Sequence, residues 1–78
     1  QATLRANPAS VLHASFSPNN KLIVTASNDD TARVWDTYGN LLAKLEGHQG
    51  NIWDANFSPN NKLIVTASDD DTAIVWDT

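Results

Sequence analysis

The chain has 78 residues and no cysteine, and its nine acidic side chains outnumber five basic ones, for a formal net charge of −4. A chain this short buries only about 60% of its surface on folding, and it has neither disulfides nor thiolate zinc ligands to support it. The acidic balance argues against nucleic acid or an anionic membrane as a partner, and no apolar run approaches the roughly 20 residues of a membrane span. We therefore expect support from packing against other copies.

Seven short β-like runs separated by turn signals predict an all-β chain. In chain order they are 11–16, 22–27, 32–35, 41–45, 52–57, 63–68 and 73–76. In the first turn Pro18 presets the backbone φ, and Asn19 and Asn20 tolerate left-handed conformations. Asn and Asp residues mark the turn after residue 27, and Gly39 marks the turn after residue 36. No stretch has helical spacing with caps.

The start of the sequence carries no basic-then-apolar leader, and we expect a cytoplasmic location. Because the first residue is Gln1 rather than Met, we expect a fragment, a processed product or an engineered piece.

One segment, FSPNNKLIVTAS, occurs twice, at 16–27 and 57–68, and the longer stretches 14–37 and 55–78 agree at 21 of 24 positions. The differences are Ser15/Asn56, Asn28/Asp69 and Arg33/Ile74. Self-similarity at a fixed period, here 41 residues, is typical of repeat architectures. The repeated strand is apolar on both faces through Leu22, Ile23 and Val24, whereas a strand with one solvated face would alternate. Stacking sheet on sheet is the expected way to cover both faces.

The segment 45–78 resembles one repeat of the WD-repeat β-propellers. The residues that carry the resemblance are Gly47, His48, Ser68, Asp70, Trp76 and Asp77. A lone Trp-Asp pair would mean little, but this ordered set at a 41-residue period is specific, and the resemblance covers nearly the whole chain. It implies an all-β propeller with four antiparallel strands per blade, in which the sequence repeat and the blade are offset by one strand.

We predict a single two-blade unit over 1–78, with repeats at 1–37 and 42–78 and a linking turn at 38–41. Two blades cannot close a ring, because closed propellers use roughly four to eight or more. The N-terminal strand of one copy, residues 1–5, is therefore expected to complete the last blade of a neighbour head to tail. Identical two-blade chains give even totals. We favour four chains and eight blades, with six or ten blades as the alternatives.

The resemblance also gives a structural interpretation to residues that look catalytic. In the family the matching His, Ser or Thr, Asp and Trp form a hydrogen-bonded chain inside each blade, so no catalytic residue, cofactor or metal is expected. The residues so assigned are His48, Ser68, Asp70 and Trp76 in the second repeat and Asn7, Ser27, Asp29 and Trp35 in the first. Because Asn7 is shorter than histidine, we expect the first network to be looser.

The run Asp69–Asp70–Asp71 raises the question of a metal, since carboxylates bind hard cations. Successive strand residues point to opposite faces, and the EF-hand pattern is absent. We interpret the run as turn residues, with a weak cation site as the alternative.

Positions at which the repeats differ predict a partner surface. In the family, the matching positions lie on the face around the central channel and contact partner peptides or proteins. The candidates are Ser10, Leu12, Asn28, Asn51, Trp53 and Asp69. Trp53 is the strongest, since tryptophan is enriched in binding hot spots. Packing of Trp53 against a neighbouring blade is an equal alternative.

The predicted function is a non-catalytic, self-assembling scaffold for protein interaction. The near-identity of the repeats also favours a purely structural or engineered building block with no natural ligand. A sugar-binding propeller is a further alternative, since Trp53 and Asp69 suit saccharide contacts. An enzyme that uses His13 or Asp54 ranks last, because these equivalent positions could equally form an ion pair across a blade boundary.

Overall fold

The computed structural model describes residues 3–4 and 10–77, which form seven β-strands and no helix. The strands are β1 (Val11–Phe16), β2 (Leu22–Ser27), β3 (Thr31–Asp36), β4 (Leu41–Glu46), β5 (Ile52–Phe57), β6 (Leu63–Ser68) and β7 (Ala73–Asp77). The all-β prediction is confirmed for these residues, and each predicted strand matches its counterpart to within one residue at either end. Of the expected strand at 1–5, the structure describes Thr3 and Leu4, neither of which belongs to a strand.

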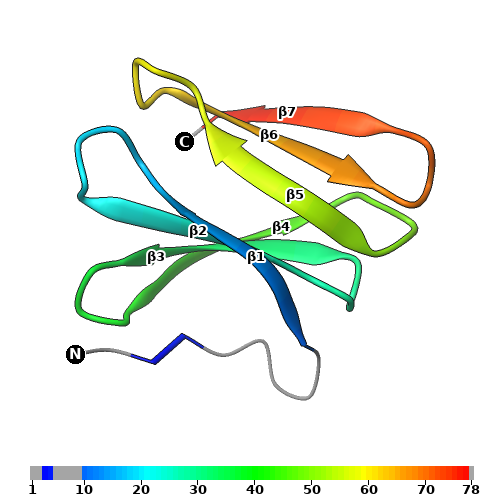
Figure 1. Ribbon diagram of the computed structural model, residues 1–78, viewed down its shortest axis with the longest axis horizontal. Helices are drawn as coiled ribbons and strands as arrows, with labels where there is room; N and C mark the ends of the chain where they lie inside the picture. Colours follow the sequence, from blue (N-terminus) through cyan, green and yellow to red (C-terminus); the bar gives the residue numbers. More distant parts are fainter. Residues whose placement is uncertain (1–2, 5–9, 78) are drawn as a thin grey trace.

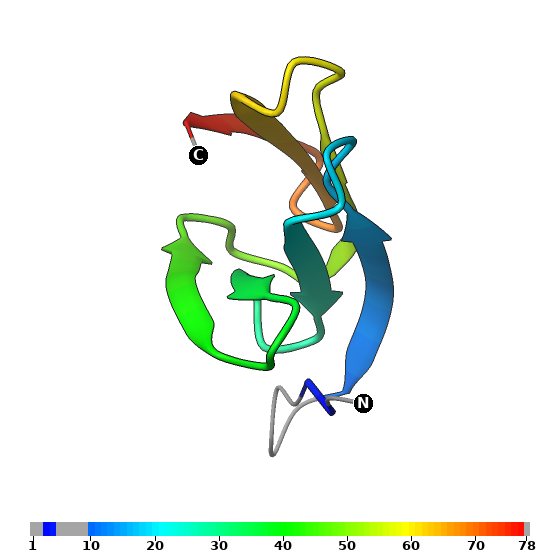
Figure 2. The ribbon, with the colours of Figure 1, turned by 90° about the vertical axis from the view of Figure 1, so that its left-hand side faces the viewer.

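The strands form two antiparallel sheets, β1-β2-β3-β4 and β5-β6-β7 (Figure 1). The turn between β3 and β4 spans 37–40. β4 follows this turn and so belongs to the second repeat by sequence, yet it pairs with β3 of the first. The structure therefore shows an offset of one strand between repeat and sheet. Figure 2 shows the sheets one above the other, with their first strands, β1 and β5, side by side.

The turn after the first strand of each repeat is held by side chains. Ser17 Oγ donates to Asn19 Oδ1 over 2.6 Å and accepts the backbone N–H of Leu22 over 3.0 Å. Asn20 takes the left-handed conformation, with a φ of 61°, so the positive φ falls on the second asparagine alone. In the turn between β6 and β7, Asp71 also takes a left-handed conformation, with a φ of 67°.

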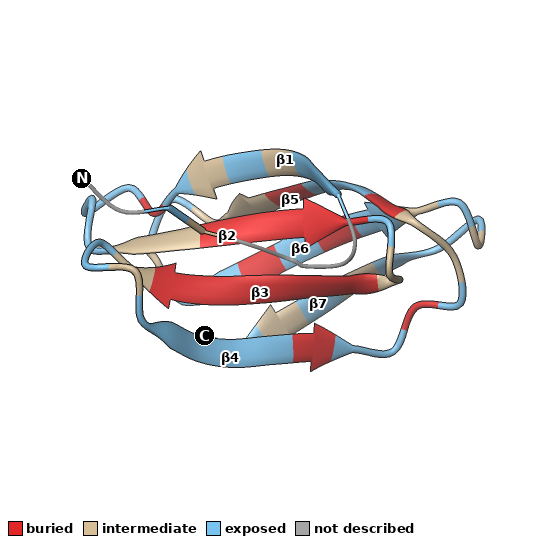
Figure 3. Cartoon of the chain, turned by 90° about the horizontal axis from the view of Figure 1, so that it is seen from below, coloured by how far each residue is buried: buried red, intermediate tan, exposed pale blue. Residues whose placement is uncertain are grey.

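The core lies between the two sheets, and it explains the apolar character of the repeated strand. Val24 and Ala26 of β2 and Ala32 and Val34 of β3 are at most 6% exposed (Figure 3). They pack with the buried side chains of Leu45, Ile52, Ala55 and Ile64. The opposite face of β2 carries Thr25, which is also buried. Both faces of this strand are thus covered, as its lack of alternation predicts.

The two repeats bury the same residues differently. The counterparts of the four core residues of β2 and β3 are exposed in the second sheet. These counterparts are Val65, Ala67, Ala73 and Val75. Conversely, Phe57 packs against the core, while its counterpart Phe16 is 62% exposed. Identical residues are therefore buried within the chain in one repeat and exposed on its surface in the other.

Candidate functional site

A chain of hydrogen bonds runs through the second sheet. Trp76 Nε1 of β7 donates to Thr66 Oγ1 of β6 over 2.9 Å, and this hydroxyl lies 2.6 Å from His48 Nε2. On the other side of the ring, His48 Nδ1 lies 3.0 Å from Asp70 Oδ2. Because the threonine hydroxyl has one proton to donate to Nε2, the geometry fits an imidazole that donates Nδ1–H to the carboxylate. The imidazole thereby connects both strands to the loop before β5.

The sequence assigned Ser68, and not Thr66, to this chain of hydrogen bonds. In the structure Ser68 Oγ donates to the carbonyl of Gly50 over 3.0 Å and accepts the backbone N–H of Asp70 over 3.1 Å. Ser68 thus fixes the turn, and Thr66 is the hydroxyl between histidine and tryptophan. Both serine and threonine lie on the face of β6 that carries Ile64, so strand alternation alone does not separate them.

Asp70 is the centre of the turn between β6 and β7. Hydrogen bonds from the Thr72 hydroxyl and from the backbone N–H of Gln49 stabilise its charged form, with a further contribution from His48. They hold the pKa of Asp70 well below its ordinary value of 3.8. The carboxylate is therefore ionised at neutral pH and accepts hydrogen bonds from the loop before β5 and from Thr72.

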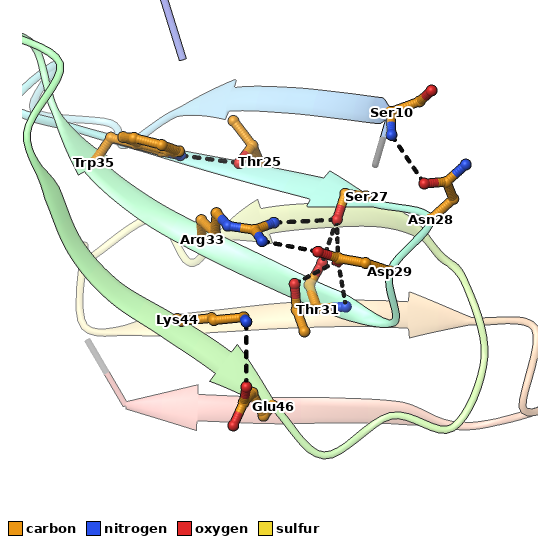
Figure 4. Close-up of polar contacts among 10 residues, drawn as sticks. All are labelled: Ser10, Thr25, Ser27, Asn28, Asp29, Thr31, Arg33, Trp35, Lys44 and Glu46. Carbon is orange, nitrogen blue, oxygen red and sulfur yellow. Dashed lines mark hydrogen bonds and ion pairs between the residues drawn. The ribbon is translucent and has the colours of Figure 1, made fainter. Parts of the chain in front are cut away.

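The first sheet has a different network around the equivalent carboxylate (Figure 4). Arg33 Nη2 donates to Asp29 Oδ2 over 2.8 Å, and Nη1 donates to Ser27 Oγ over 3.3 Å. The Arg33 side chain is only 11% exposed. Burial alone would raise the pKa of Asp29, but hydrogen bonds from Arg33, Ser27 and Thr31 outweigh it and hold this pKa well below 3.8. Trp35 Nε1 donates to Thr25 Oγ1 over 2.9 Å, as its counterpart does in the second sheet.

The sequence led us to expect a looser first network because of Asn7. Asn7, the predicted replacement for histidine, lies outside the described residues. Among the residues that the structure describes, the basic partner of Asp29 is Arg33, which stands where the second repeat has Ile74. The substitution of arginine for isoleucine on β3 therefore supplies a charged partner from within the sheet.

His48 is fully engaged in the network of the second sheet. Both ring nitrogens of His48 are engaged, and its side chain is fully buried. The described part of the chain also contains no cluster of three or more His, Cys, Asp or Glu side chains that could hold a metal ion. Asp70 and Asp71 lie in the turn between β6 and β7, and the Asp70 carboxylate already accepts hydrogen bonds from within the chain. What this arrangement does is bind strands and loops together.

The six candidate contact residues gather at one end of the sheets, where β1 and β5 begin and β2 and β6 end. Ser10 N donates to Asn28 Oδ1 over 2.9 Å, and the backbone N–H of Asp69 donates to the carbonyl of Asn51 over 2.9 Å. Trp53 Nε1 donates to the carboxylate of Asp69, while the tryptophan remains 52% exposed. The indole is therefore oriented by its N–H and still presents a large part of its ring system to solvent.

A β-bulge positions this tryptophan. The pairing of β5 with β6 shifts register between Ile52 and Asp54, so Trp53 is the extra residue. The pairing of β1 with β2 shifts in the same way at Leu12, which is 37% exposed. Bulges turn a side chain out of the regular alternation. Both repeats therefore expose an apolar side chain at this end, a large aromatic one in the second repeat.

A second polar cluster joins the two sheets along β1 and β5. His13 Nε2 lies 3.1 Å from Asp54 Oδ1 and 3.0 Å from Ser15 Oγ. Ser15 Oγ donates to Asn56 Oδ1 over 3.1 Å, and Asn56 Nδ2 donates to Asp54 Oδ2 over 3.1 Å. The contact between His13 and Asp54 across the blade boundary is thus present as an ion pair if the imidazole is protonated.

Comparison with known proteins identifies the family to which the chain is similar. The family model described as "WD domain, G-beta repeat" matches residues 1–36 and 39–77. Among curated proteins, Protein tipD of Dictyostelium discoideum is 41% identical over 51 residues, which are 64% of this chain and 8% of that protein. The matched region is therefore a small part of the relative's length.

Proposed function

This chain belongs to the WD-repeat family, whose repeats generally mediate protein interaction or scaffolding, and we propose that it supplies two blades of a β-propeller that acts as a non-catalytic protein-interaction scaffold. The ring is completed by further copies of the chain, and we favour four chains and eight blades over three chains and six.

The observation that carries the proposal is the unequal burial of identical residues. Val24 and Val34 are 0% and 6% exposed beneath the second sheet, while their counterparts Val65 and Val75 are 45% and 65% exposed. An exposed apolar face of this kind commonly marks an interaction site. A further blade placed on the second sheet, as the second sheet is placed on the first, would bury these valines as their counterparts are buried.

The opposite side of the chain offers the matching surface. Phe57 packs against the core inside the chain, and its counterpart Phe16 is exposed on the first sheet. Contact between the Phe16 side of one copy and the Val65 and Val75 side of another therefore repeats the contact already present within the chain. Such a head-to-tail contact closes into a ring if the rotation per copy is right.

The edge of the second sheet supports the same assembly. Among the described strands β7 pairs with β6 alone, whereas β3 pairs with both β2 and β4. The proposal assigns the fourth strand to residues 1–5 of a neighbouring copy, which align in sequence with 42–46 and lie largely outside the described residues.

The proposed partner surface is the end that carries Trp53. Carboxylates gather in the loops at this end, at Asp30, Asp69, Asp70 and Asp71, while Lys21 and Lys62 lie in the loops at the opposite end. A peptide or protein segment with basic side chains suits this combination, because aromatic faces and carboxylates both attract cations.

The assembly is tested by placing one charge on the exposed face of the second sheet. Val75→Asp is compared with Tyr38→Asp, which adds the same charge at a side chain that is 87% exposed, outside the core. We expect Val75→Asp to lower the native mass measured by light scattering and Tyr38→Asp to leave it unchanged. Equal masses for both variants would contradict the proposed junction.

The partner surface is tested by Trp53→Ala. Because Trp53 is half exposed and hydrogen-bonded within its own blade, we expect the native mass to stay unchanged while binding of basic peptides weakens. If the assembly dissociates instead, Trp53 packs between blades. A building block without a natural ligand is the second candidate, favoured by the 21 of 24 identical positions in the repeats. Peptide binding that Trp53→Ala leaves unchanged would contradict the proposed partner surface and favour this second candidate.

A further inference from the structure

The cluster at β1 and β5 brings together positions at which the two repeats differ. His13 and Asp54 occupy equivalent positions, as do Ser15 and Asn56, and each meets its own counterpart across the sheet boundary. The neighbouring Ala14 and Ala55 are identical. The differences between the repeats at these two pairs of positions are therefore complementary.

The hydrogen bonds of the cluster have a fixed direction. Ser15 donates its single hydroxyl proton to the Asn56 carbonyl oxygen, 3.1 Å away, so its oxygen accepts from the His13 Nε2–H, which also faces Asp54. The Asn56 amide in turn donates to the second oxygen of Asp54. A junction with aspartate on both sides would bring two carboxylates together, and one with histidine on both sides would lack a countercharge.

We propose that this cluster is the recognition element at each junction between copies: a second copy of the chain docks its β1 beside β5 of the first, so that Asp54 and Asn56 of one copy meet His13 and Ser15 of the next. This inference rests on the proposed self-assembly and specifies how the copies recognise one another. Blades of the first and second repeat then alternate around the ring.

The geometry within the chain supports this junction. By strand pairing, His13 lies on the same face of the first sheet as Ala26, the face covered by the second sheet. Asp54 lies on the same face of the second sheet as Ala67, the exposed face onto which the next copy would dock. Asp54 therefore faces the next copy from the same position in its sheet from which His13 faces Asp54. In the assembly each Asp54 carboxylate is flanked by two imidazoles, one from its own chain and one from the next copy.

Selection, rather than stability, is the role that suits a pair this accessible. The side chains of His13 and Asp54 are 35% and 52% exposed. Ion pairs in such surroundings contribute little to stability, whereas like charges at the same place exclude wrong partners. The apolar face at the junction carries no charge, so the polar cluster, and not the apolar contact, rejects a partner that presents a like charge.

The test uses two variants that cannot satisfy their own junctions. His13→Asp has aspartate at both positions, and Asp54→His has histidine at both. Each variant alone is expected to dissociate at a concentration at least 10-fold higher than the wild type, and an equimolar mixture is expected to regain the wild-type mass as one-to-one complexes in native mass spectrometry. Tyr38→Asp is the control for added charge.

The doubly swapped chain, His13→Asp with Asp54→His, guards against a folding defect. It restores a complementary pair at every junction and should assemble like the wild type, yet fail to mix with it. If both single variants assemble as the wild type does, or if the swapped and wild-type chains mix at random, the inference is wrong while the proposed self-assembly stands. A wild-type chain that stays at 8.5 kDa overturns both.

Discussion

Replacement of Thr66 by valine tests the hydrogen-bonded chain of the second sheet most sharply. Thr66 is fully buried, and its hydroxyl lies between Trp76 Nε1 at 2.9 Å and His48 Nε2 at 2.6 Å. Valine has nearly the same shape, so the change removes the hydroxyl without opening a cavity. The His48 side chain is fully buried, and its nitrogen then has no access to water.

The expected loss of stability follows from the polar groups that Thr66→Val leaves without a hydrogen-bond partner. A buried polar group without a partner costs about 1–3 kcal/mol. The buried His48 nitrogen incurs this cost, whereas Trp76 is partly exposed and recovers part of its hydrogen bond from water. We therefore expect Thr66→Val to lower the free energy of unfolding by about 2–4 kcal/mol, a large share of the roughly 5–15 kcal/mol of a typical protein.

The first repeat supplies a matched control in an identical strand. Thr25→Val frees Trp35 Nε1, and without a histidine at the equivalent position we expect a smaller loss of about 1–2 kcal/mol. Urea unfolding followed by tryptophan fluorescence, at one chain concentration for all variants, measures both losses. Equal losses for the two variants, or a loss below about 1 kcal/mol for Thr66→Val, would refute the assignment of Thr66.

Three other predictions concern the turns and the first network. Gly50→Ala places a Cβ 2.9 Å from the backbone nitrogen of Asp70, so the thermal midpoint should fall by several degrees, and an unchanged midpoint would contradict this close approach. Arg33→Ile leaves Asp29 without its charged partner and should cost about 1–3 kcal/mol in urea unfolding, whereas no loss would mean that the ion pair contributes nothing. Because the pKa values of Asp29 and Asp70 are lowered from 3.8 by folding, their stabilisation is present above about pH 4 and is lost as pH falls further. A urea midpoint that stays constant from pH 5 to about pH 2 would contradict this pH dependence.

The strands were predictable from the sequence because their signals are local. Turn residues such as Pro18 and Gly39 bound each run, and the apolar run of β2 indicated a strand covered on both faces. The structure places that strand in the core, with Val24 and Ala26 buried. Local rules were also sufficient for the positive φ of an asparagine in the first turn, though not for which of the two asparagines takes it.

The networks were less predictable because they depend on which side chains meet across strands. The choice between Thr66 and Ser68 requires the position of His48 relative to β6, which no spacing along the chain gives. The role of Arg33 requires the register of β2 and β3, which places Arg33 opposite Thr25. The sequence did show Arg33/Ile74 as a difference between the repeats, and a charged residue in place of an apolar one on a buried strand was the available signal.

The central claim, that two blades recruit further copies of the same chain, is tested most directly by the native mass of the wild type. Light scattering after size exclusion is expected to give about 34 kDa for four chains of 8.5 kDa, or about 25.5 kDa if three chains form six blades. A folded species of 8.5 kDa at every concentration would contradict the claim, because the exposed valines of the second sheet would then be stable in water without a partner.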